Sequence, residues 1–88
     1  MEISNNNHIV KLTDRSNIII NSINKIIDFD SREISIESSM GVIIIKGSDL
    51  EVIKLDTIDG NISVKGNIDG INYLDSAGKN KDSMITKL

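Results

Sequence analysis

One stretch of the sequence occurs twice, nineteen positions apart. GVIIIKGSDLEVIKL covers residues 41–55, and GNISVKGNIDGINYL covers residues 60–74. Both copies have apolar residues at the second and fourth positions after their first glycine, then a Lys-Gly pair, and both end in leucine. Alternation with a period of two is typical of a strand with one buried face, because successive side chains point to opposite faces of a sheet. We therefore expect each copy to form a strand, a tight glycine turn and a second strand.

The two copies together indicate which face of each strand is buried. Residues 42–45 are all apolar, so the first copy alone suits either face. The second copy has Asn61 and Ser63 where the first has Val42 and Ile44. Shifting the assignment by one residue would turn every side chain to the other face of the strand. Only one of the two assignments therefore gives an apolar buried face in both copies. The predicted core positions are Ile43, Ile45, Ile62 and Val64.

The composition favours strands over the whole chain. Nineteen of the 88 residues are isoleucine, whereas alanine occurs once and proline is absent. Branching at Cβ restricts side chains in helices and packs well on a pleated surface. Turn signals follow one another about every 8–12 positions, which is typical of a small all-β domain. The glycines that we assign to structural turns are Gly41, Gly47, Gly60, Gly66 and Gly70.

These features predict one all-β domain over residues 8–75, between a flexible leader (1–7) and a flexible tail (76–88). The preferred architecture is an antiparallel meander of about six strands, rolled into a barrel or sandwich. The alternative is a short β-solenoid of two or three rungs, which the repeat also suits. No apolar run is long enough to span a membrane, and the first residues do not resemble a signal peptide. A cytoplasmic protein without membrane insertion is expected.

Charge and cysteine content narrow the function. Thirteen acidic and ten basic residues give a net charge of −3, and cysteine is absent. Nucleic-acid binding normally requires a basic surface, so a small barrel of the Sm-like or OB-like kind that binds nucleic acid is only the alternative function. The absence of cysteine excludes disulfides and thiolate metal sites.

No constellation of residues suggests catalysis. His8 is the only histidine, and a general base needs a carboxylate partner that the sequence does not supply beside it. Asp28, Asp30 and Glu33 lie close together in the sequence, but the glycine and further oxygen ligands of a calcium loop are missing. We therefore predict a protein that is not an enzyme and has no catalytic residue, cofactor or metal.

Three apolar residues point away from the predicted core. Ile19 lies between the inward Ile18 and Ile20, and the other two are Val42 and Ile44. An exposed apolar patch usually marks an interface, so these three residues form the candidate interface. The alternative is a second buried layer, formed by residues 22–29 folding over them.

Residues 8–73 resemble the YabP/YqfC family of sporulation proteins. The matching landmarks are Arg15, the 22–30 stretch, 37–41, the I-x-I-K-G of 43–47, Leu50, Leu55, the G-x-I-x-V-x-G of 60–66, and the I-x-Y of 71–73. Where the family usually has a glycine, this chain has Asn21 and Ser22, and asparagine tolerates the left-handed conformation that glycine supplies.

The resemblance implies a small non-enzymatic protein of endospore-forming bacteria. Such a protein is made in the mother cell and acts at the forespore surface in assembly of the spore envelope, cortex or coat. The partners it implies are a second copy of the chain and a membrane-bound or coat sporulation protein.

Overall fold

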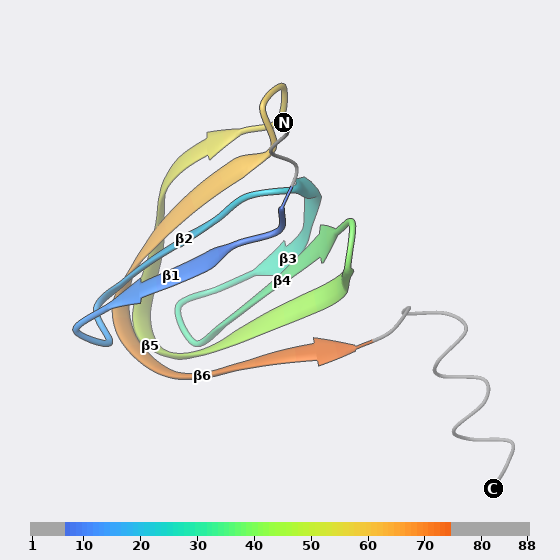
Figure 1. The fold of residues 1–88 in the computed structure, drawn as a ribbon. Helices are drawn as coiled ribbons and strands as arrows, with labels where there is room; N and C mark the ends of the chain where they lie inside the picture. The colour runs from blue at the N-terminus through green and yellow to red at the C-terminus, as the bar shows by residue number, and fades with distance from the viewer. Residues whose placement is uncertain (1–6, 75–88) are drawn as a thin grey trace, which may run out of the picture.

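Six strands, all in one antiparallel sheet, account for most of residues 7–74, the part of the chain that the computed structural model describes (Figure 1). The prediction of an all-β domain with about six strands is confirmed. The predicted tail, Asp75 and the predicted leader apart from Asn7 lie outside the described residues. The strands are β1 (Val10–Thr13), β2 (Asn17–Ile20), β3 (Ile23–Phe29), β4 (Glu33–Ser38), β5 (Gly41–Asp56) and β6 (Asn61–Leu74).

The strand order is β1-β2-β6-β5-β4-β3. From β3 to β6 the strands follow one another as a meander, and the β1–β2 hairpin adds beside β6. Every pair of neighbouring strands is antiparallel. The solenoid alternative is wrong, because stacked rungs would pair in parallel. No ladder joins β1 to β3 among the described residues, so the sheet is not closed into a barrel.

The two copies of the repeat are β5 and β6, and each pairs with the other in two sections. Residues 42–46 of β5 pair with residues 70–74 of β6, and residues 51–56 pair with residues 61–65. Both strands bend sharply between these sections, which Figure 1 shows where β5 and β6 curve together. The sheet therefore folds over into two layers.

Each layer contains one half of each long strand. The β2 layer consists of β1, β2, residues 61–65 of β6 and residues 51–56 of β5. The β4 layer consists of β3, β4, residues 41–46 of β5 and residues 70–74 of β6. The hydrophobic core lies between the two layers.

The bend explains the repeated glycines. Gly47 and Gly66 lie inside β5 and β6, so the predicted tight turns at these positions are wrong. A Cβ atom at Gly66 would lie 2.5 Å from the backbone oxygen of Asp49, and one at Gly47 would overlap the carbonyl of Asn67. Only glycine permits the two backbones to approach so closely where both strands bend. Gly70 also lies inside β6, but a Cβ atom there would meet nothing within 4 Å.

The turns of the β1–β2 and β3–β4 hairpins accept hydrogen bonds from the bends of β6 and β5. The backbone N–H of Gly66 donates to the carbonyl of Ser16 in the β1–β2 turn, at 3.1 Å. The N–H of Gly47 donates in the same way to the carbonyl of Arg32 in the β3–β4 turn, at 3.0 Å. Gly47 and Gly66 occupy equivalent positions in the two copies of the repeat, and each donates a hydrogen bond to the turn of a short hairpin. The two halves of the molecule are therefore related by an approximate two-fold symmetry.

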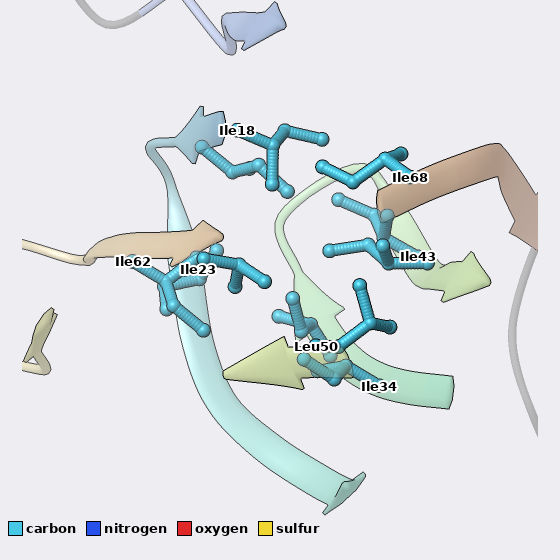
Figure 2. Packing of buried hydrophobic residues seen from close by; sticks show 11 residues of the cluster. Ile18, Ile23, Ile34, Ile43, Leu50, Ile62 and Ile68 are labelled. Carbon is cyan, nitrogen blue, oxygen red and sulfur yellow. The ribbon is translucent and has the colours of Figure 1, made fainter. Parts of the chain in front are cut away.

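The core consists almost entirely of isoleucine. Its side chains come from β2 to β6 and point toward one another between the layers (Figure 2). All four predicted core positions are at most 1% exposed, so the phase inferred from the repeat is confirmed. The buried cluster is Ile18, Ile20, Ile23, Ile34, Ile36, Ile43, Ile45, Leu50, Ile62, Val64 and Ile68.

Candidate interaction surfaces

The three residues of the candidate interface do not lie together. Ile19 is in the β2 layer, opposite Lys11 and Ser63 on the neighbouring strands. Val42 and Ile44 are in the β4 layer, on β5. All three lie on the outer faces of their layers, and these faces point in opposite directions because the core fills the space between them. A single patch of these residues does not form.

Their exposure also differs. Ile19 is 45% exposed, as expected for an outward residue, but Val42 is only 7% exposed. Ile44 is half-buried. The alternative, in which residues 22–29 fold over these residues as a second layer, is wrong, because β3 pairs beside β4 at the edge of the sheet. Val42 is outside the main core cluster, on the opposite face of β5 from Ile43.

The sheet has four edges where a strand section lacks a neighbour on one side among the described residues. Two are the outer strands β1 and β3. The others arise from the folding of the sheet: residues 51–56 of β5, and residues 70–74 of β6, here called the β6 edge. An unpaired edge presents free N–H and C=O groups to a further strand, and proteins usually block such edges with charges, bulges or short strands.

Three of these edges are blocked. β1 has four residues and carries Lys11. β3 has two register shifts and carries Lys25 and Asp28. Residues 51–56 contain a register shift after Val52 and the charged Lys54.

The β6 edge has none of these features. Its sequence is GINYL, its residues 70–74 pair with β5 without a register shift, and Tyr73 and Leu74 are 47% and 38% exposed. It is the most receptive edge in the described part of the chain.

His8 and Tyr73 connect the start of the domain to the β6 edge. The Nε2 atom of His8 lies 2.7 Å from the Tyr73 hydroxyl, and its Nδ1 atom lies 3.2 Å from the carbonyl oxygen of Asn21. A carbonyl only accepts, so Nδ1 carries the proton and the tyrosine hydroxyl donates to Nε2. The two rings meet edge to face, with centroids 5.7 Å apart. The sequence interpretation of His8 as a solvated residue missed this pair, because no local signal connects residues 65 positions apart.

A second connection lies at the other end of the gap between β1 and β6. The Arg15 side chain donates to the carbonyl of Ile68 at 3.0 Å and lies 3.2 Å from a carboxylate oxygen of Asp69. Both side chains are largely exposed, so the ion pair contributes little stability. Between the two connections lies an open hollow of about 170 Å³, lined in part by Leu12, Gly70 and Ile71.

The turn between Asn21 and β3 uses a different residue from the one expected. Ser22 has the positive φ, of 60°, where the sequence favoured asparagine. The side chain of Asn21 instead accepts from the N–H of Ile9 and donates to the carbonyl of Asn7 at 2.8 Å. Asn21 therefore fixes the chain before β1, next to His8.

The acidic groups of the β3–β4 turn have a structural role. A carboxylate oxygen of Asp30 accepts from the N–H of Arg32 at 2.7 Å and from that of Glu33 at 2.9 Å. These two hydrogen bonds lower the pKa of Asp30 from its ordinary value of 3.8. Within residues 7–74, no group of three histidine, cysteine or acidic side chains is placed to hold a metal ion. No helix in the same part of the chain is long and apolar enough to cross a membrane.

These features define a class: a small folded-over antiparallel sheet with one unblocked edge. Comparison with known proteins identifies the family. The chain matches the YabP family over residues 4–80. It is also 31% identical over 68 residues to the spore protein YabP of Bacillus subtilis (strain 168), an alignment that covers 77% of this chain and 68% of that relative. The chain belongs to the YabP family, and the resemblance seen in the sequence is confirmed.

Proposed function

We propose that this protein is a non-enzymatic adaptor in endospore formation. In this role it acts in the mother cell at the forespore surface and joins components of the spore envelope, either cortex or coat. Its contacts are β-mediated: one with a second copy of the chain, the other with a membrane-bound or coat sporulation protein.

The observation that carries the proposal is the relationship to the spore protein YabP of Bacillus subtilis. The surfaces described above agree with an adaptor role. An unblocked edge binds another strand through main-chain hydrogen bonds, which is a common mode of protein recognition. The half-buried Ile44 and the exposed Ile19 provide apolar area on the two outer faces.

The proposal is tested by deleting the gene in the organism that encodes it. We expect normal vegetative growth, accumulation of the protein only after sporulation begins, and spores with a defective envelope or reduced heat resistance. Wild-type protein supplied in trans should restore the spores, and the Ile62→Asp variant, which loses the core, should not. A constant vegetative level of the protein together with a growth defect would contradict the proposal.

The purified protein also tests the alternative function, nucleic-acid binding. With a net charge of −3, it has no basic excess to release counterions from a phosphate backbone. We expect no mobility shift of single-stranded RNA or DNA at physiological salt. A shift that weakens as salt increases would favour nucleic-acid binding over the adaptor role.

A further inference from the structure

The β6 edge is complementary to itself. In an antiparallel pair related by a two-fold axis at Asn72, each asparagine faces its own copy, and the remaining pairs are Tyr73 with the partner's Ile71 and Leu74 with the partner's Gly70. An aromatic residue opposite a β-branched residue is a favourable cross-strand pair. Residues 70–74 contain no charge, so the pairs within the edge bring no like charges together. The acidic residues that the register would place opposite each other, Asp69 and the partner's Asp75, lie just outside the edge.

The space around Gly70 suits this register. A side chain at Gly70 would meet nothing within 4 Å, so the strand has free space at this position. Leu74, which is 38% exposed, is the residue that the register places opposite Gly70. The exposed leucine of the edge therefore faces a glycine, where no side chain obstructs it.

We propose that the β6 edge pairs with the same edge of a second copy of this chain and forms a two-fold dimer. The β4 layer then continues from β3, β4, β5 and β6 into the same four strands of the partner. This proposal rests on the adaptor role and deepens it by naming the partner and the contact.

Three observations favour a second copy as the occupant. A two-fold contact uses the same surface on both molecules, so one self-complementary edge is sufficient. His8 holds the Tyr73 hydroxyl at 2.7 Å, so the ring that would face the partner's Ile71 is already ordered, which lowers the entropic cost of pairing. Ile44 lies opposite Asn72 on β5, so the pairing would take place beside the apolar outer residues Ile44 and Val42.

Charge reversal at the two-fold axis gives the first test. Asn72 is exposed on the outer face, so the Asn72→Lys and Asn72→Glu variants should fold normally. Each alone would place like charges opposite each other in the dimer. Sedimentation equilibrium should give twice the chain mass of 9.7 kDa for the wild type, and the single-chain mass for either variant alone. An equimolar mixture of the two variants should recover the dimer mass.

The matched control is Asn24→Lys, on the β3 edge, which should keep the dimer mass. A monomeric wild-type protein would overturn the proposal. So would dimers of Asn72→Lys as stable as those of the wild type, since the contact would then lie elsewhere, or an equimolar mixture that stays monomeric.

Cysteine crosslinking gives the second test, because the chain has no cysteine of its own. Directly opposed residues in an antiparallel pair have Cα atoms about 4.5–5.5 Å apart, within the range of a disulfide. Asn72→Cys should form a disulfide-linked dimer on mild oxidation much faster than Asn24→Cys. Equal rates would overturn the proposed edge.

The two proposals fail separately. If the adaptor role is correct and the dimer is not, the gene deletion damages spores while the wild-type protein sediments as a monomer. If the dimer is correct and the adaptor role is not, Asn72→Lys abolishes the dimer while deletion leaves spores intact.

Discussion

The two copies of the repeat agree at their inward positions and differ at two of their outward ones. Ile43 and Ile45 in β5 correspond to Ile62 and Val64 in β6, and all four are buried in one core. On the outer face, the first copy has Val42 and Ile44 where the second has the polar Asn61 and Ser63. The shared inward positions therefore build the fold, and the outward positions distinguish its two layers.

The second sections of the two copies differ in the same way. After the bend, β5 continues with charged residues and a register shift, whereas β6 continues with the uncharged, regular β6 edge. The two strands of the repeat thus differ at their ends: residues 51–56 of β5 form a blocked edge, and residues 70–74 of β6 form an open one. The inward positions therefore stabilise the sheet, whereas the outer faces and the β6 edge are available to a partner.

The largest effect is expected in the shared core. Ile43→Asp and Ile62→Asp each bury an unpaired carboxylate, which costs roughly 4 kcal/mol or more, close to the whole stability of a small domain. Both variants should be insoluble or lack a cooperative thermal transition in far-UV circular dichroism. The milder Ile43→Val and Ile62→Val should each cost about 1 kcal/mol. A marked difference between the two copies would show that they do not share one core.

The bend provides the next test. Gly66→Ala brings a methyl group against the Asp49 carbonyl at a residue whose φ is 142°, so we expect a loss of about 2–3 kcal/mol in urea unfolding. Gly70→Ala in the same strand meets open space and should stay within about 0.5 kcal/mol of the parent. Measuring both in the Asn72→Lys background keeps association out of the comparison. Equal losses would remove the distinction between the bend and the β6 edge.

The outer face should show smaller effects. Ile44 is half-buried, and its counterpart Ser63 is polar, so Ile44→Asp should cost about 1 kcal/mol and leave the far-UV spectrum unchanged. It should nevertheless weaken self-association or partner capture, because a charge would replace apolar surface beside Asn72. Val42→Asp should cost more, about 2–3 kcal/mol, because Val42 is only 7% exposed. If Ile44→Asp unfolds the protein as Ile43→Asp does, the outer face is a second core.

The smallest effect concerns the turns. A carboxylate oxygen of Asp56 accepts from the N–H groups of Asp59 and Ile58, both at 3.0 Å. The hydrogen bond from Asp59 is the main cause that lowers the pKa of Asp56 below 3.8, as the bond from Arg32 does for Asp30. Folding favours the ionised form of both groups, so their contribution is present above pH 3.8 and is lost as the pH falls through the lowered folded pKa.

Acid titration of stability checks this expectation. Asp30→Asn and Asp56→Asn should flatten the dependence of the melting temperature on pH below about 5. A slope unchanged in both variants would show that other carboxylates govern the acid response.

The sequence determined the phase of the strands, and therefore the core. Alternation has a period of two, so comparing the copies was enough to assign Ile43, Ile45, Ile62 and Val64 to the interior. The same periodicity placed Ile18 and Ile20 inside and Ile19 outside. These assignments depend only on the alternation of side chains between the two faces of a strand, which can be read directly from the order of the residues.

Only the tertiary structure decided which strands are neighbours and where they bend. Glycine is compatible with a turn and with close backbone approach, so local reasoning placed turns at Gly47 and Gly66, where two long paired strands bend together. The same limit applies to the β6 edge and to the pair of His8 and Tyr73. Both depend on contacts between residues far apart in the chain, and the free energy of such contacts is absent from any single segment. Whether an outward residue is covered, as Val42 is and Ile19 is not, follows from the same non-local packing.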